Sequence, residues 1–250
     1  MILPPFLPGR LTRLTVLDLG LFDVRGGERI IGIPAYLLET DHGARILIDT
    51  GFPPAYATDP GIADRDGLPV FGRLVNFGPE QTAAGALGLL GLAPKDIDLL
   101  ILSHGHIDHV GSLPLFAHAP VVLTAVERSD PKPRYFGTAR PIDWPDATYH
   151  LIDAETPVCD GLTLIPTPGH TLGHLSAILD LPETGRVILA IDALNRASEP
   201  GEHFADAEDP KAAQASADRL LALGGPDALL IYGHEPSQWP TLRKAPAFYA

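Results

Sequence analysis

The chain has only one cysteine, Cys159, which excludes two kinds of stabilising site. No disulfide can form within the chain, and a single sulfur cannot build a thiolate-rich zinc site. We interpret Cys159 as a small buried or loop residue. A metal site in this sequence would therefore rest on imidazole and carboxylate ligands.

Basic residues and long apolar runs are also scarce. Lys and Arg number 18 against 31 Asp and Glu, which gives a formal charge of −13 and no basic cluster to bind phosphates. No stretch approaches the roughly 18 apolar residues of a membrane span. The start, MILPPFLPGRLTRLTV, has prolines where a signal peptide carries an uninterrupted apolar core. We therefore expect a cytoplasmic protein that binds neither nucleic acid nor membrane.

Proline and glycine, by contrast, are abundant. The 26 Pro and 25 Gly residues predict many tight turns and some long, rigid loops. A hydrophobic fraction of 45% with 20% charged residues is typical of a globular protein. No linker or repeat divides the sequence, so we expect one α/β domain over residues 1–250.

Short apolar runs bounded by turn residues predict the strands. These are residues 14–19, 31–39, 45–49, 99–102, 120–124, 162–167, 187–191 and 229–232. Helices are predicted at 80–92, from 110 to 116, and at 209–223, where Asp209 is the expected N-cap. Residues 53–79 and 126–149 lack periodicity and are rich in aromatic side chains. We predict that 53–79 is either a lid or binding loop or a segment that covers the core, and that 126–149 is a loop that walls a pocket.

The segment LLILSHGHIDHVGSL, residues 99–113, concentrates metal-capable side chains. Its apolar run ends at Ser103, and His104, His106, Asp108 and His109 follow within six residues. Histidines at i and i+2 of an extended segment point to the same side and can share one ion. Asp108 and His109 can face a second ion beside the first. Neutral imidazole and carboxylate together suit zinc, iron, cobalt or manganese better than calcium or magnesium.

Three further predicted strands each run into a metal-capable residue: His170, Asp192 and His234. Ligands at the ends of strands in a layered α/β domain converge on one site. The full set of five histidines and two aspartates is enough for two ions that share one carboxylate. Asp49 also ends a strand, where it either caps a turn or accepts a histidine N–H behind a metal ligand. His174 is interpreted as lying behind the ligands or as a packing residue.

The order of these residues resembles the metallo-β-lactamase superfamily. Within it the sequence is most similar to the N-acyl homoserine lactonases, in the segments PAYLLETDHGARILIDTGFP, TPGHTLGH, AIDA and IYGHEP. The resemblance implies an αββα sandwich of two mixed β-sheets flanked by helices. It also implies two divalent ions, usually zinc and sometimes iron, cobalt or manganese. One ion would be held by His104, His106 and His170, the other by Asp108, His109 and His234, with Asp192 bridging them.

One position departs from the lactonase pattern. These enzymes place a tyrosine three residues after the bridging aspartate, where it contacts the substrate carbonyl, and here that position is Asn195. Asparagine can still donate a hydrogen bond, over a shorter reach. Tyr135 or another loop residue is a candidate to take the place of the family tyrosine.

The expected chemistry is metal-assisted hydrolysis. Two ions lower the pKa of a water held between them and so supply hydroxide near neutral pH, while Asp108 can hold or shuttle the proton. The chain has no Gly-x-Ser-x-Gly motif, so no serine nucleophile is indicated. We therefore expect a hydrolase that opens the ester bond of lactones, most of all N-acyl homoserine lactones, with a quorum-quenching role.

Other functions stay open at this point. Within the same chemistry these are a thioesterase, a general lactonase or esterase, and a phosphotriesterase. From another class, a non-hydrolytic di-metal redox protein is an alternative, although di-iron relatives carry glutamate where this chain has His106. The expected partner is a small lactone or ester substrate. The apolar start at residues 1–9 is a candidate interface arm of a homodimer.

Overall fold

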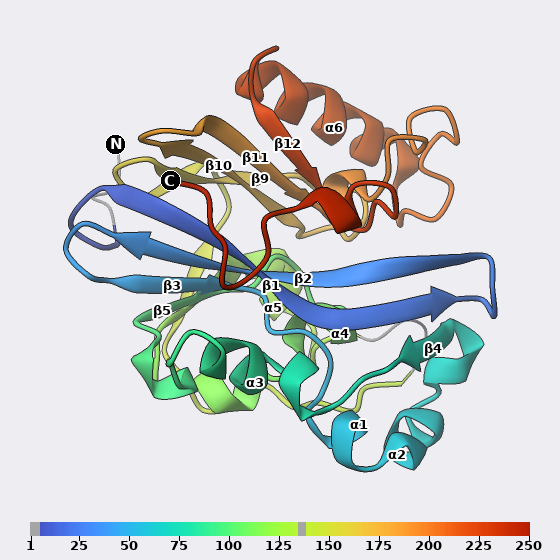
Figure 1. Cartoon of the computed structure of the whole chain (residues 1–250). Helices are drawn as coiled ribbons and strands as arrows, with labels where there is room; N and C mark the ends of the chain where they lie inside the picture. The colour runs from blue at the N-terminus through green and yellow to red at the C-terminus, as the bar shows by residue number, and fades with distance from the viewer. Residues whose placement is uncertain (1–5, 135–138) are drawn as a thin grey trace.

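Two β-sheets pack face to face with helices on both outer sides (Figure 1). The computed structural model describes residues 6–134 and 139–250. The larger sheet has the strand order β4-β1-β2-β3-β5-β6-β7, and the smaller has the order β12-β11-β10-β9-β8. Both sheets are mixed: neighbouring strands from β3 through β5 and β6 to β7 are parallel, as are β11 and β12, whereas the other neighbours pair antiparallel. The expected αββα sandwich is confirmed.

The larger sheet is built on a long hairpin. Its first two strands, β1 (Leu11–Val24) and β2 (Arg29–Thr40), pair along their whole length with a bulge between Asp18 and Leu21. The remaining strands are β3 (Arg45–Ile48), β4 (Gly72–Val75), β5 (Leu99–Ile101), β6 (Val121–Thr124) and β7 (Tyr149–Ile152).

The smaller sheet carries the longest helix on its outer face. Its strands are β8 (Thr156–Cys159), β9 (Leu162–Pro166), β10 (Leu175–Leu181), β11 (Gly185–Ile191) and β12 (Leu229–Tyr232). Helix α6 (Pro210–Gly224) begins as expected at Asp209, whose carboxylate accepts from two backbone N–H groups of the first turn. Its Ala213, Ala217 and Leu220 bury an apolar stripe against β11.

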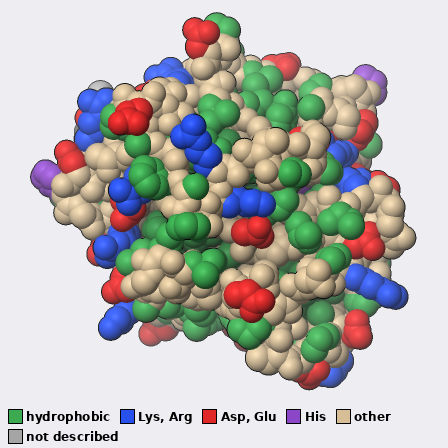
Figure 2. Space-filling view, viewed as in Figure 1, with side chains coloured by type: hydrophobic (Ala, Val, Ile, Leu, Met, Phe, Trp, Pro, Cys, Tyr) green, Lys and Arg blue, Asp and Glu red, His purple; other side chains and the backbone are tan. Residues whose placement is uncertain are grey.

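Short helices cover the other face of the larger sheet. They are α1 (Ala55–Thr58), α2 (Pro60–Arg65), α3 (Ala83–Gly88), α4 (Ile107–Val110) and α5 (Ala125–Arg128). Single 3₁₀ turns occur at Leu68–Val70, Pro79–Gln81, Pro94–Asp96, Leu113–Phe116, Asp192–Leu194 and Trp239–Thr241. One apolar core lies under these helices and a second lies between the two sheets. The face seen in Figure 2 scatters acidic and basic side chains among apolar ones.

Several element predictions were wrong. The loop expected at 53–79 contains α1, α2, a 3₁₀ turn and β4, because tertiary contacts order a segment that has no periodicity of its own. The helix expected at 80–92 is reduced to α3, since glycines at 88 and 91 weaken its second half and Gly91 has a φ of +71°. The helix expected from 110 to 116 is a 3₁₀ turn at Leu113–Phe116 instead, with a proline in its first turn. Strands β7, β8 and β10 were not predicted.

Other expectations have simpler outcomes. Cys159 ends β8 and is buried, which raises the pKa of its thiol to about 11. In the two described ranges, no helix combines the length and the apolar character needed to cross a bilayer. Tyr135 and residues 1–5 of the candidate interface arm lie outside the described residues.

Candidate metal centre

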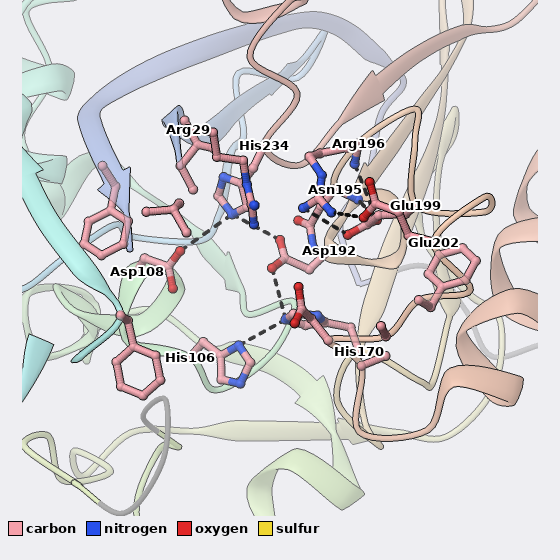
Figure 3. A pocket seen from close by; sticks show the side chains of 18 of the residues that line it. Arg29, His106, Asp108, His170, Asp192, Asn195, Arg196, Glu199, Glu202 and His234 are labelled. Carbon is pink, nitrogen blue, oxygen red and sulfur yellow. Dashed lines mark hydrogen bonds and ion pairs between the residues drawn. The ribbon is translucent and has the colours of Figure 1, made fainter. Parts of the chain in front are cut away.

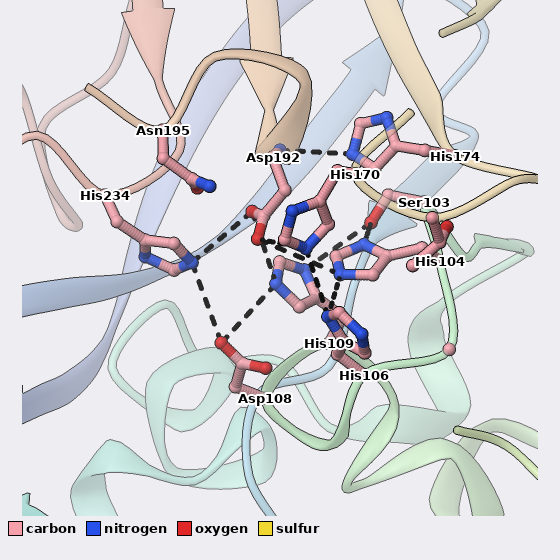
Figure 4. Close-up of polar contacts among 12 residues, drawn as sticks. Ser103, His104, His106, Asp108, His109, His170, His174, Asp192, Asn195 and His234 are labelled. Carbon is pink, nitrogen blue, oxygen red and sulfur yellow. Dashed lines mark hydrogen bonds and ion pairs between the residues drawn. The ribbon is translucent and has the colours of Figure 1, made fainter. Parts of the chain in front are cut away.

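The seven candidate ligands lie together in two neighbouring clusters (Figure 4). His104 and His106 follow β5 of the larger sheet, and Asp108 and His109 lie on α4 directly after them. The other three ligands follow strands of the smaller sheet: His170 after β9, Asp192 after β11 and His234 after β12. The predicted convergence of strand-end residues is confirmed, and both sheets contribute to it.

The first cluster consists of three imidazoles and one carboxylate oxygen. His106 Nδ1 lies 3.0 Å from His104 Nε2 and 3.1 Å from His170 Nε2. Asp192 Oδ2 lies 3.0 Å from His170 Nε2 and 3.8 Å from His104 Nε2. Nitrogen and oxygen ligands at about 2.05 Å from a tetrahedral zinc ion are about 3.4 Å apart, so these separations fit one ion.

The second cluster uses the other oxygen of Asp192. Asp192 Oδ1 lies 3.5 Å from His109 Nε2 and 3.4 Å from His234 Nε2. Asp108 Oδ2 lies 3.5 and 3.6 Å from the same two nitrogens. Within the described chain, His109 Nε2, Asp192 Oδ1 and Asp108 Oδ1 are buried and have no hydrogen-bond partner. Buried polar atoms are normally paired, so the unpartnered His109 Nε2 and Asp192 Oδ1, which lie 3.5 Å apart, fit a second cation.

The protonation preferences of the two clusters differ. Burial, followed by the neighbouring His109 and His106, lowers the pKa of His104 well below its ordinary value, and burial with His170 lowers the pKa of His106 to about 3. These rings are therefore neutral, which is the form that ligates metals. Burial by itself also lowers the pKa of His109, but the carboxylates of Asp108, Asp192 and Asp49 raise it well above its ordinary value. This cluster attracts positive charge, whether a proton or a metal ion.

The carboxylates of both clusters are held in the ionised form. Burial alone raises the pKa of Asp192, yet His234, His170 and His109 outweigh it and hold the pKa well below the usual range. The pKa of Asp108 is also lowered, because His109 and His234 overcome the effect of burial.

Asp49 supports the second cluster from behind. Its Oδ2 accepts from His109 Nδ1 at 2.8 Å and from Ser103 Oγ at 2.7 Å, and its Oδ1 accepts from Ser103 N at 2.8 Å. Of the two roles predicted for Asp49, the structure shows the contact with a histidine N–H. This bond fixes the His109 ring with Nε2 toward the cluster.

His174 and His234 are fixed in the same manner by neighbouring groups. His174 Nε2 accepts from the backbone N–H of Asp192 at 3.1 Å, so its ring proton lies on Nδ1 and is donated to Thr167 Oγ1 at 2.8 Å. His174 thus lies behind the ligands, which is one of the two positions expected for it. His234 Nδ1 lies 2.8 Å from the carbonyl oxygen of Gly32. The Trp239 ring packs directly on Gly32, since a Cβ added to this glycine would lie 2.0 Å from the ring.

Replacing Asp49 with asparagine is expected to weaken metal binding at the second cluster by about 10- to 100-fold. The amide has one acceptor oxygen and cannot accept from His109 Nδ1, Ser103 Oγ and Ser103 N together. Zinc titration against a competing chelator measures the change. Asp98→Asn is the control, since Asp98 is exposed and its carboxylate accepts from the Arg45 N–H; equal affinities in both variants would contradict the role of Asp49.

A cavity of about 270 Å³ opens in front of the two clusters (Figure 3). Its apolar wall comes from the β1–β2 hairpin and the segments around it, through Phe22, Ile31, Phe52 and Phe71. The opposite wall is the segment after β11, which contributes Asn195, Arg196, Glu199, Glu202 and Phe204. The expected aromatic wall is found in part, at Phe52 and Phe71, whereas no described residue of 126–149 lines the cavity. The sequence did not indicate the hairpin residues as pocket residues, because Ile31 lies in a strand pattern typical of a core and Phe22 lies outside every predicted strand.

Asn195 lies in the cavity wall close to the second cluster. Its N–H donates to Glu199 Oε2 at 2.6 Å, and its carbonyl oxygen accepts from His234 N at 3.0 Å. The backbone on both sides of the asparagine is therefore tied to the site. Its Oδ1 is buried and lacks a hydrogen-bond partner among the described residues.

Two mixed sheets with flanking helices and a shared aspartate between two His-rich clusters define a metallohydrolase. The family model described as "Metallo-beta-lactamase superfamily" matches residues 31–234. The chain belongs to this superfamily.

Relatives of known activity cover nearly the whole chain. The N-acyl homoserine lactonase of Bacillus thuringiensis is 29% identical over 231 residues, which is 88% of this chain and 88% of the relative. The N-acyl homoserine lactonase AttM of Azorhizobium caulinodans is 27% identical over 246 residues, or 90% and 89% of the two chains. A solved structure of a B. thuringiensis AiiA mutant, with N-decanoyl-L-homoserine bound at its active site, has a TM-score of 0.80 at 24% identity. It covers 96% of this chain and 100% of that one, and it shows a common fold.

Proposed function

We propose that this protein hydrolyses the ester bond of N-acyl homoserine lactones. The observation that carries the proposal is the shared carboxylate: Asp192 presents one oxygen to each cluster and faces the cavity. The near full-length similarity to lactonases supports a lactone as the substrate. The apolar wall at Phe22, Phe52 and Phe71 suits an acyl chain, and its aromatic rings exclude water from the reacting ester.

The proposed cofactors are two zinc ions, with iron, cobalt or manganese as alternatives. One ion would be held by Asp192 Oδ2 and three histidines, His104, His106 and His170. The other ion would be held by Asp192 Oδ1 together with Asp108, His109 and His234. Such a pair of ions supplies an activated water at neutral pH and draws charge from a carbonyl oxygen. Mixed imidazole and carboxylate ligands of this number suit these metals.

Two side chains of this chain are proposed to act on the substrate directly. Asp108 lines the cavity, is ionised, and has an Oδ1 without a hydrogen-bond partner in the described structure, so this oxygen would be free to accept the proton of the attacking water and pass it to the leaving alkoxide. Asn195 lines the same cavity, and its side-chain N–H is proposed to donate to the lactone carbonyl oxygen.

A substrate panel tests the proposal. The protein, reconstituted with zinc, is assayed on acyl homoserine lactones, simple lactones, thioesters and phosphotriesters. We expect kcat/KM for the acyl homoserine lactones to exceed that for the other classes by about 100-fold, which corresponds to about 2.7 kcal/mol of transition-state discrimination. A higher kcat/KM for thioesters or phosphotriesters would overturn the substrate assignment.

A further inference from the structure

Glu127 is a buried carboxylate that the proposed mechanism does not use. It lies on α5, at the edge of the larger sheet, and only 4% of it is exposed. Burying a carboxylate is costly unless hydrogen bonds or an opposite charge compensate. Among the described residues no Lys or Arg forms an ion pair with Glu127, so backbone and hydroxyl donors surround it instead.

Those donors come from the two segments that carry ligands of the first cluster. Glu127 Oε2 accepts from the N–H of Gly105, between His104 and His106, at 3.0 Å. Glu127 Oε1 accepts from the Thr171 hydroxyl, directly after His170, and from Gly173 N at 3.2 Å. One carboxylate therefore fastens together chain segments that are 66 positions apart, counted from Gly105 to Thr171.

The packing around Glu127 leaves these segments little freedom. A Cβ on Gly173 would lie 2.3 Å from Thr124 Oγ1 and 2.7 Å from Glu127 Cγ, so the segment rests directly on α5. Thr124 Oγ1 also donates to the carbonyl oxygen of Gly173 at 2.7 Å. A Cβ on Gly105 would lie 3.1 Å from Glu127 Oε2.

We infer that Glu127 is a positioning residue for the first cluster, which fixes His106 and His170 relative to each other and places a buried negative charge behind them. The first cluster has three imidazoles and a single carboxylate oxygen, whereas the second has two carboxylates. A further buried carboxylate bonded to the segments that carry these ligands favours a divalent cation there, because charges interact more strongly in a protein interior than in water. This inference rests on the proposed metal binding and not on the identity of the substrate.

The test is a zinc titration of Glu127→Gln against a competing chelator. Glutamine keeps the size of the side chain but removes the charge, and its NH₂ group cannot accept from Gly105 N or Gly173 N. The zinc affinity of each cluster is measured separately. The His234→Ala background keeps all ligands of the first cluster, and the His106→Ala background keeps all ligands of the second. We expect the affinity of the first cluster to fall about 10- to 100-fold and that of the second to stay unchanged.

The controls separate positioning from general damage. Glu155→Gln, at an exposed glutamate paired with Arg219, is expected to leave both affinities unchanged. Thr171→Val removes one donor and keeps the charge, so it is expected to weaken the first cluster less than Glu127→Gln and serves if the latter fails to fold. Wild-type affinity in both variants, or an equal loss at both clusters, would overturn the inference. A protein that shows the selective loss but cleaves no lactone would uphold it and contradict only the proposed substrate.

Discussion

Replacing Asp192 with asparagine is expected to lower kcat/KM for a lactone by about 1000-fold or more, which corresponds to about 4 kcal/mol of lost transition-state stabilisation. Asp192 Oδ2 lies 3.0 Å from His170 Nε2 and 3.8 Å from His104 Nε2, and its Oδ1 lies 3.4 to 3.5 Å from two ligand nitrogens of the second cluster. An amide carries no charge, and its NH₂ group would turn a donor toward one of the clusters. The variant therefore loses the carboxylate that the two clusters share.

Steady-state kinetics with zinc-reconstituted protein measure this effect. Asp180→Asn is the matched control, because Asp180 lies on β10 in an exposed ion pair with Arg186 and is expected to leave the rate unchanged. Activity of Asp192→Asn within about tenfold of the wild type would contradict the proposed mechanism, since a rate that depends on the shared carboxylate cannot survive its removal.

Removal of the metal ions is expected to abolish hydrolysis and to lower the melting temperature by about 10 °C. A ligand present at about 1000 times its Kd stabilises the folded state by about 4 kcal/mol. In a chain of this size each kcal/mol shifts the melting temperature by roughly 2–4 °C. The metal-free protein also retains two buried carboxylates, Asp108 and Asp192, whose nearest positive partners would be histidines.

Dialysis against a chelator, followed by calorimetry and an activity assay, measures both effects. Adding back zinc, cobalt or manganese one at a time is expected to restore activity and melting temperature together. If the protein keeps its rate after elemental analysis has shown it to be free of metal, hydrolysis proceeds without the cations and the proposed role of the clusters is wrong.

The candidate ligands were predictable because each stands at a sharp break in the sequence pattern. Asp192 follows the apolar run of β11, and His234 follows that of β12 after one glycine. An apolar strand that ends in an imidazole or carboxylate has few structural explanations. The ends of strands in layered α/β folds also converge, so order along the chain was enough to gather the set.

The supporting groups were less visible in the sequence. Glu127 lies in the short helix α5, inside a stretch predicted to be a loop, and nothing in its neighbours marks it as buried. The contact of His234 with the Gly32 carbonyl joins positions 202 residues apart, which no local pattern encodes. Asp49 was singled out only because it also ends a strand, and its partner became apparent once α4 was seen beside it.

The short elements of the fold were the least predictable. Helices α1 and α2 have four and six residues, too few to show a 3.6-residue period or to be stable alone. They form because Tyr56 of α1 and Ala63 of α2 complete the core under the larger sheet. Strands of three or four residues, such as β7 and β8, are likewise fixed by their neighbours in the sheet.

The count of metal ions per chain tests the central claim most directly. Elemental analysis of the purified protein, after dialysis into metal-free buffer, is expected to find two divalent ions per chain, with one lost when His234 is replaced by alanine. A wild-type protein that holds no ion, or that holds one ion with full lactonase activity, would contradict the account.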